Sequence, residues 1–130
     1  IAAGGTAMDH EGFFLHPTIL TGVTPSMDIA RTEVFGPVLS VLSFDDEAEA
    51  IRIANDSDYG LVGGVFTQDI DRAMRVARDV GAGQIFINEW YAGGVETPFG
   101  GYKQSGYGRE KGREALMNYV QTKNIGIRIG

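Results

Sequence analysis

Apolar and polar positions along the middle of the chain alternate in blocks that predict strands and helices in turn. Residues 38–44 are mostly apolar and rich in β-formers, which is typical of a strand covered on both faces. Asp46 then caps a helix, and Glu49 three residues later completes a near capping box. The buried stripe expected for this helix consists of Ala50, Ile51 and Ala54.

The same pattern repeats further along the chain. Residues 61–67 predict a second buried strand, in which Gly63 and Gly64 mark either a bulge or a close backbone approach. Asp69 caps the next helix, and residues 84–88 predict a third strand. The apolar stripe expected for this helix consists of Ile70, Ala73, Met74, Ala77 and Val80. Short connections in the order β-α-β-α-β predict an α/β fold with a parallel sheet.

Two shorter elements are expected before these blocks. Residues 13–20 predict a strand that Pro17 interrupts, which favours a place at the edge of a sheet. Thr24 is the expected N-cap of a short helix with Pro25 at its first position. The glycine and proline at residues 36–37 end this helix.

The end of the chain predicts a helix followed by a strand. Residues 110–120 have a helical pattern, and residues 122–129 place isoleucines at alternate positions, which gives a strand one apolar face. No later segment can pair with this strand, so we expect it to join an existing sheet edge or the sheet of another chain. A homo-oligomer, either a dimer or a tetramer, is the hypothesis that follows, and a frayed tail is the alternative.

A glycine-rich stretch at residues 97–110 fits neither a helix nor a strand. Phe99, Tyr102 and Tyr107 add large apolar area and favour an ordered loop. The glycine spacing does not match the dinucleotide fingerprint or a phosphate loop. Anion binding through the loop amides and a purely structural loop both remain open at this point.

The segment that leaves the third predicted strand carries Trp90 and Tyr91 next to each other. Ligands of parallel α/β sheets collect beyond the carboxyl ends of the strands. Two adjacent large aromatic residues in a loop cannot both point into one core. We therefore expect at least one of them to line a pocket or an interface.

Composition narrows the function. Eleven Lys and Arg residues against 17 Asp and Glu residues give a net charge of −6, which argues against nucleic-acid or anionic membrane partners. No apolar run is long enough to cross a bilayer and no signal-peptide pattern is present, so we predict a cytoplasmic protein. The chain has no cysteine, and its two histidines have no partners at metal-ligand spacing, so no metal site and no catalytic residue are predicted.

Four ordered blocks identify a family resemblance that covers nearly the whole chain. Residues 98–110, Pro-Phe-Gly-Gly-Tyr-Lys-Gln-Ser-Gly-Tyr-Gly-Arg-Glu, resemble the glycine-rich segment near the C-terminus of the NAD(P)-dependent aldehyde dehydrogenases. Residues 33–38, Glu-Val-Phe-Gly-Pro-Val, resemble the cofactor-contacting motif of the same superfamily. Residues 55–61 and 83–88 also fit, in the order of the family.

The resemblance implies oxidation of an aldehyde to a carboxylic acid with NAD or NADP. In this family a cysteine thiolate attacks the aldehyde and a glutamate activates water, and these two groups belong to segments upstream of this chain. Glu33 would hold the hydroxyls of the nicotinamide ribose, and Phe35 would pack beside the nicotinamide. Phe99, Trp90 and Tyr91 would line the aldehyde entrance.

The chain then corresponds to a C-terminal portion of the enzyme. Residues 1–121 would form the end of the catalytic domain, and residues 122–130 the oligomerisation strand. We expect such a portion to be inactive by itself, because covalent catalysis of this kind needs a thiolate. The absence of an initiator methionine favours this interpretation over the alternative, a stand-alone α/β binding or assembly module without catalysis.

Overall fold

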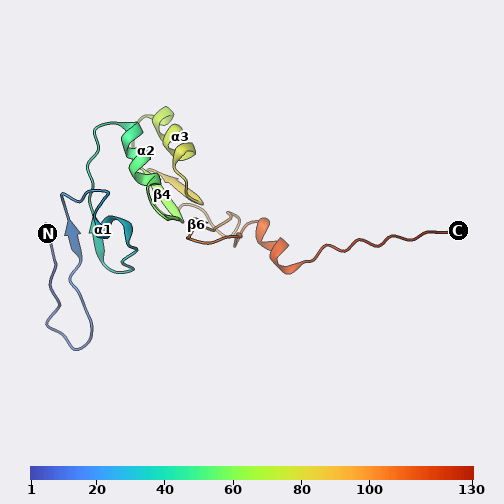
Figure 1. Cartoon of the computed structure of the whole chain (residues 1–130), viewed down its shortest axis with the longest axis horizontal. Coiled ribbons are helices and arrows are strands. Elements are labelled where there is room, and N and C mark those ends of the chain that lie inside the picture. The colour runs from blue at the N-terminus through green and yellow to red at the C-terminus, as the bar shows by residue number, and fades with distance from the viewer. The chain divides into compact units, whose positions relative to one another are not determined.

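Parallel strand pairs joined through a helix form the regular part of the structure, a computed structural model that describes residues 1–130 (Figure 1). The chain divides into two units, Ile1–Asp58 and Tyr59–Gly130. The elements in chain order are β1 (Thr18–Leu20), α1 (Asp28–Arg31), β2 (Val38–Ser40), α2 (Glu47–Asn55), β3 (Tyr59–Gly60), β4 (Val62–Val65), α3 (Ile70–Asp79), β5 (Gln84–Ile87), β6 (Tyr102–Lys103) and the 3₁₀ helix η1 (Glu114–Tyr119).

In the first unit, β1 pairs with β2 in parallel, with Thr18 opposite Val38. The predicted strand over residues 13–20 is therefore shorter than expected. Pro17 has no N–H to donate, and regular pairing begins only at the next residue. Phe13 is fully exposed, and Leu15 forms only an isolated bridge with Ala7.

The predicted start of the first helix is wrong. Thr24 does not cap it, because its carbonyl accepts a hydrogen bond from Met27 N–H at 3.1 Å and its hydroxyl lies 3.1 Å from Ser26 Oγ. These contacts make a turn over residues 24–27, and α1 begins only at Asp28. Met27 stands at the N-cap position and offers no side-chain hydrogen bond.

The capping prediction for α2 is confirmed. Asp46 Oδ1 accepts a hydrogen bond from Glu49 N–H at 2.8 Å, and Glu49 Oε2 accepts one from Asp45 N–H at 2.9 Å. Both interactions satisfy amide groups that a helix or the turn before it leaves without partners. The stripe is narrower than expected, since Ala50 and Ile51 are half-buried while Ala54 is exposed.

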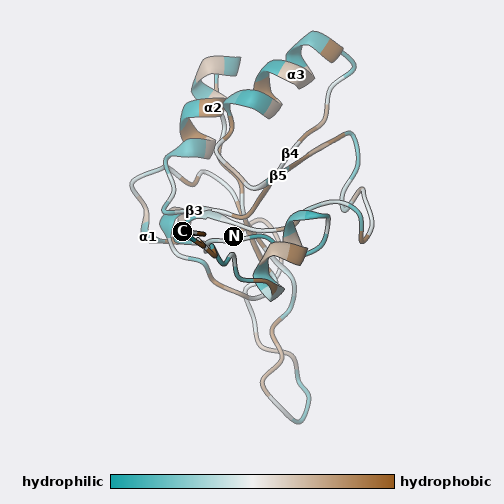
Figure 2. Ribbon diagram, turned by 90° about the vertical axis from the view of Figure 1, so that its right-hand side faces the viewer, coloured by the Kyte–Doolittle hydropathy of each residue, from teal (hydrophilic) through white to brown (hydrophobic).

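In the second unit, β4 pairs with β5 in parallel and in continuous register, from Val62 opposite Gln84 to Val65 opposite Ile87. Helix α3 packs against both strands, and Figure 2 shows its largely polar outer side next to the apolar strands. Ala73 is the buried residue of this helix. The predicted stripe is again narrower, because Ile70 and Met74 are exposed.

The expectation of one continuous β-α-β-α-β sheet is wrong. The strands form three two-stranded sheets, and β2 pairs with β1, its neighbour across α1. A two-stranded sheet leaves its strands less covered, so residues 38–44 do not form a strand buried on both faces. Leu39 and Phe44 are both 59% exposed.

The glycine-rich stretch forms an ordered loop, as predicted. Phe99 and Glu110 exchange two backbone hydrogen bonds of 2.7 Å each, which close residues 99–110 at their base. The expectation that no residue here is in a strand is wrong for Tyr102–Lys103, which pair with β3 in antiparallel fashion. The loop is therefore closed at its base and paired with β3 in its middle.

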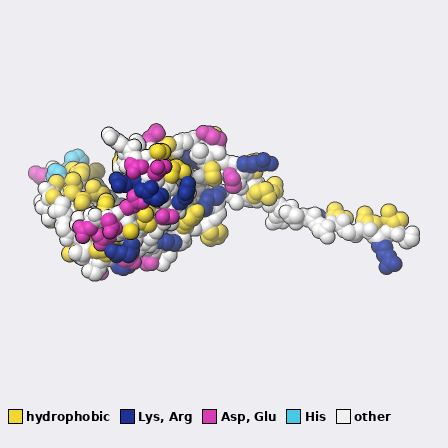
Figure 3. Space-filling model, turned by 90° about the horizontal axis from the view of Figure 1, so that it is seen from above, with side chains coloured by type: hydrophobic (Ala, Val, Ile, Leu, Met, Phe, Trp, Pro, Cys, Tyr) yellow, Lys and Arg dark blue, Asp and Glu magenta, His cyan; other side chains and the backbone are white.

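The end of the chain differs from the prediction. An α-helix over residues 110–120 is replaced by η1, because Lys111 (φ 56°) and Gly112 (φ 59°) adopt left-handed backbone conformations that interrupt a helix. Residues 121–130 pair with no sheet edge of this chain. They form an extended tail with apolar side chains along it (Figure 3). None of the helices has the length and apolar character needed to cross a bilayer.

Candidate functional site

The two predicted cofactor-contacting residues lie in the first unit, in the connection between α1 and β2. Glu33 is exposed and takes part in no hydrogen bond or ion pair with the protein. Phe35 is 94% exposed and has a φ of 54°, an uncommon value for a bulky residue. Both side chains are thus presented outward from one short loop and are free to meet a ligand.

The three predicted substrate-lining residues lie in the second unit, and two of them belong to an aromatic cluster. Phe86 is buried in β5, and its ring centroid lies 5.8 Å from that of Trp90 and 6.0 Å from that of Tyr91. Trp90 and Tyr91 meet edge to face at 6.0 Å. These spacings are typical of attractive ring pairs. Both outer rings remain more than half exposed.

Gly64 explains how the indole reaches the sheet. A Cβ atom at this position would lie 2.7 Å from Trp90 Cζ3. The register of β4 and β5 has no interruption at Gly63 or Gly64, so the glycine pair does not form a bulge. The sequence offered a bulge or a close backbone approach. The structure has no bulge, and the group that comes close to Gly64 is the Trp90 side chain and not a backbone segment.

A cavity of about 290 Å³ brings Tyr91 and Phe99 together. Lys111 places its Nζ atom 5.7 Å from the centroid of the Phe99 ring, a cation–π contact. Gln84 Nε2 donates a hydrogen bond to Pro98 O at 3.1 Å and anchors the segment that carries Phe99. The remaining lining residues are Phe86, Ala92, Gly93, Gly94, Thr97 and Glu110. An aromatic wall with a few polar groups suits a small, weakly polar ligand.

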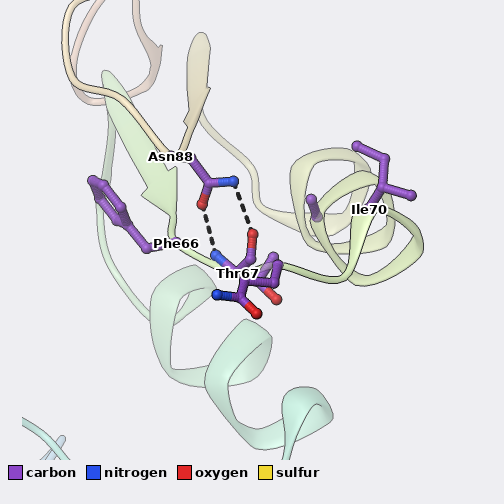
Figure 4. Close-up of a pocket in the computed structure, with 6 residues that line it drawn as sticks. Phe66, Thr67, Ile70 and Asn88 are labelled. Atoms are coloured by element: carbon purple, nitrogen blue, oxygen red, sulfur yellow. Dashed lines mark hydrogen bonds between the residues drawn. The ribbon is translucent and has the colours of Figure 1, made fainter.

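A second pocket, of about 420 Å³, lies at the carboxyl ends of β4 and β5 (Figure 4). It is lined by Phe66, Thr67, Gln68, Ile70, Ala73 and Asn88. The carboxamide of Asn88 is bonded to the backbone of Thr67. Beside the pocket, Asp69 Oδ1 accepts a hydrogen bond from Arg72 N–H at 3.0 Å, and this bond lowers the pKa of Asp69. The polar groups here serve the fold.

The glycine-rich loop borders a third cavity, of about 470 Å³. Arg109 Nη1 donates to Gly108 O at 2.6 Å and to Gly101 O at 3.2 Å, and the guanidinium lies 5.3 Å from the centroid of the Tyr102 ring. The cation is therefore engaged with the carbonyl groups of the loop. This arrangement favours the structural role of the loop over anion binding.

Neither a nucleophilic thiol nor a metal cluster is part of this chain. The sequence has no cysteine, and no group of three or more His, Asp or Glu side chains is placed to hold a metal ion. Asn88 lines the pocket of about 420 Å³ and Lys111 lines the cavity of about 290 Å³, and neither was predicted from the sequence as a site residue. A signal for Asn88 exists, since asparagine directly after a strand tolerates a left-handed turn.

Comparison with known proteins gives consistent similarities. A family model described as "Aldehyde dehydrogenase family" matches residues 1–125. An aldehyde dehydrogenase of Emericella nidulans is 47% identical over 130 residues, which are 100% of this chain and 26% of that protein. A betaine aldehyde dehydrogenase of Brucella anthropi is 53% identical over 120 residues, 92% of this chain and 25% of that protein.

Solved structures agree with these similarities. A crystal structure of a betaine aldehyde dehydrogenase point mutant from Staphylococcus aureus, in complex with NAD+, superposes with a TM-score of 0.90 at 47% identity. The superposed region is 95% of this chain and 26% of the chain of that enzyme. An NAD-dependent aldehyde dehydrogenase from Sinorhizobium meliloti gives a TM-score of 0.89 at 43% identity. The superposed region is 93% of this chain and 24% of the chain of that enzyme. The chain spans about a quarter of the length of these relatives.

Proposed function

Because the chain belongs to the aldehyde dehydrogenase family, we propose that it is part of an enzyme that oxidises an aldehyde to a carboxylic acid with NAD or NADP. The observation that carries this proposal is the family match over residues 1–125, nearly the whole chain. The relatives include a structure solved with NAD+ and proteins named for betaine aldehyde.

The residues of the α1–β2 connection fit a nicotinamide nucleotide. The carboxylate of Glu33 has no protein partner, so it can accept hydrogen bonds from two ribose hydroxyls, and a charged acceptor makes such bonds stronger. The exposed ring of Phe35 offers an apolar surface beside them. When bound, the nucleotide supplies the hydride acceptor. The part of Glu33 and Phe35 is to hold and orient it.

The cavity between Tyr91 and Phe99 is the proposed aldehyde entrance. Both rings, with Trp90 beside them, present apolar area that removes water from an entering chain or ring. The thiol nucleophile of the reaction is not among these residues, because the chain contains no cysteine. We therefore propose that the 130-residue chain has no aldehyde oxidation activity by itself.

The tail is the proposed oligomerisation strand. Ile125, Ile127 and Ile129 are 74%, 80% and 90% exposed, and they alternate with polar, charged or glycine positions. An extended segment with one apolar face and free backbone groups is suited to add to the sheet edge of a second copy. Residues 1–121 then form the end of the catalytic domain, and residues 122–130 connect protomers.

A direct assay tests the function. The full-length protein that contains this chain is incubated with NAD+ or NADP+ and with acetaldehyde, benzaldehyde or betaine aldehyde, and the reduced nucleotide is followed by its absorbance. We expect turnover of at least one aldehyde by the full-length protein and none by the 130-residue chain under the same conditions. Failure of every aldehyde with both nucleotides would contradict the proposal, and turnover by the short chain would contradict its predicted inactivity.

A further inference from the structure

The last pairing of the β4–β5 ladder is made by a side chain. Asn88 N–H donates to Val65 O at 2.9 Å as the ladder ends. Beyond it, Thr67 N–H donates to Asn88 Oδ1 at 2.7 Å, and Asn88 Nδ2 donates to Thr67 O at 2.8 Å (Figure 4). The carboxamide thus bonds both backbone groups of Thr67 and stands where a longer strand would offer backbone partners.

This side-chain pairing frees the main chain to leave the sheet. Asn88 has a φ of 56°, a left-handed conformation that asparagine adopts more readily than most residues. The backbone turns at this residue while the polar groups of Thr67 keep their partners. A carboxamide suits this arrangement, since it offers an N–H donor and a carbonyl acceptor side by side.

The direction of this exit decides where the aromatic rings lie. Two residues after Asn88, the indole of Trp90 returns to the sheet and covers Gly64. Tyr91 follows with a φ of 63° and lines the cavity that also contains Phe99. The three rings of Phe86, Trp90 and Tyr91 are in mutual contact, so a shift of one moves the others.

We propose that Asn88 is a positioning residue for the aldehyde entrance, because its bonds to Thr67 fix the exit angle that holds Trp90 on Gly64 and Tyr91 in the cavity wall. The inference rests on the proposed function for the identity of the entrance. It assigns Asn88 no contact with substrate. Its effect passes through the two aromatic residues and therefore concerns the choice among aldehydes.

The test compares three variants in the full-length protein. Asn88→Gly keeps a residue that accepts positive φ but removes both bonds to Thr67. Gly64→Ala keeps those bonds and displaces the indole directly. Ser43→Gly, at an exposed serine outside the proposed sites and the tail, is the control. We expect the first two to lower kcat/KM for benzaldehyde roughly 10-fold, since small misplacements near a reacting group are costly. Acetaldehyde turnover and the KM for the nucleotide should change little.

A double-mutant cycle separates positioning from a general structural role. If Asn88 acts through Trp90, the effect of Asn88→Gly on benzaldehyde should largely disappear in a Trp90→Ala background. Additive effects, or equal losses for acetaldehyde, benzaldehyde and the nucleotide, would overturn the inference. A wild-type protein without aldehyde oxidation would overturn the proposed function and the assignment of an entrance with it.

A spectroscopic measurement examines the geometry without any activity. Trp90 is the one tryptophan of this chain. Its fluorescence in the full-length protein is obtained by subtracting the emission spectrum of Trp90→Phe from that of the wild type. We expect Asn88→Gly to increase the acrylamide quenching of this component, because the indole leaves Gly64. Unchanged quenching would show that Asn88 does not hold Trp90 and would overturn the inference even in an active enzyme.

Discussion

The hydroxyl of Ser105 accepts a hydrogen bond from Gly60 N–H at 3.0 Å, across 45 positions of sequence. This bond joins the tip of the glycine-rich loop to β3, next to the short antiparallel pairing of β3 with β6. Gly60 is buried, so its amide would lose its partner without access to abundant water if the hydroxyl were removed. The loop therefore depends on one side chain in its turn.

Ser105→Ala should destabilise the second unit by about 1 kcal/mol, the usual cost of leaving a buried donor unsatisfied. Urea denaturation followed by circular dichroism measures this loss. Ser43→Ala, at an exposed serine of the first unit, serves as the control and should leave the midpoint unchanged. A midpoint for Ser105→Ala equal to that of the control would show that the bond contributes nothing.

Gly83→Ala adds only one methyl group but should strongly destabilise the fold. A Cβ at Gly83 would overlap the carbonyl oxygen of Gly100, where the glycine-rich loop passes over the start of β5. The contact is with backbone, which cannot rotate away, so we expect a loss of about 3 kcal/mol or a failure to fold. Urea denaturation followed by circular dichroism measures this loss. Gly126→Ala places its Cβ within 4 Å of no atom beyond its chain neighbours and should leave the midpoint unchanged.

The local signals of the sequence were sufficient for the parts of the fold that are decided within a few residues. Asp46 and Asp69 cap helices because the amides they bond lie three positions away. The parallel pairing of β4 with β5 across α3 also followed from the order of elements. The pairing of β2 with β1 could not be predicted in the same way, because a strand can accept a parallel partner on either of its two edges and the sequence does not specify which edge is used.

The same contrast holds for the candidate site. From their size and their place after a strand, at least one of Trp90 and Tyr91 was expected to line a pocket or an interface, and Tyr91 lines the cavity that also contains Phe99. The role of Gly64 was left open between two alternatives, since only the structure brings the indole to it. The left-handed backbone at Lys111 was not predicted, because lysine seldom adopts it and the helical pattern of residues 110–120 was given more weight than the glycine at position 112.

The stability of α3 should depend on pH through its N-cap. The hydrogen bond from Arg72 N–H lowers the pKa of Asp69 below its ordinary value of 3.8. A lowered pKa in the folded state means that the ionised form stabilises the fold above pH 3.8, and that this contribution is lost as the pH falls through the folded-state pKa. Acid should therefore weaken the wild-type helix more than a helix with a neutral cap.

Asp69→Asn provides that neutral cap, since asparagine accepts the same bond but does not titrate. We expect the difference in urea midpoint between wild type and Asp69→Asn to be constant near neutral pH. Below about pH 4, the midpoint of the wild type should fall more than that of Asp69→Asn. Asp71→Asn, in the first turn of the same helix but not at the cap, is the control. A pH-independent difference between wild type and Asp69→Asn would contradict the assignment.

Glu33→Gln addresses the proposed nucleotide site in the full-length protein. Glutamine keeps the shape and one acceptor oxygen but loses the charge, so the ribose should be held less firmly and hydride transfer should slow roughly 10-fold. Single-turnover stopped-flow absorbance measures that step. Glu11→Gln, an exposed glutamate in the same unit, is the control. An unchanged hydride-transfer rate, with an intact fold by circular dichroism, would remove Glu33 from the site.

The tail makes the sharpest prediction about assembly. Alternation along an extended segment places Ile127 on the apolar face and Arg128 on the opposite one. If the tail adds to the sheet of a second copy, Ile127→Asp places a charge in that contact and should reduce the molar mass measured by light scattering, whereas Arg128→Ser should leave the mass unchanged. Equal masses for wild type and both variants would mean that the apolar face of the tail does not hold the protomers together. Catalytic activity need not follow the mass, since Tyr91 and Phe99 belong to one chain.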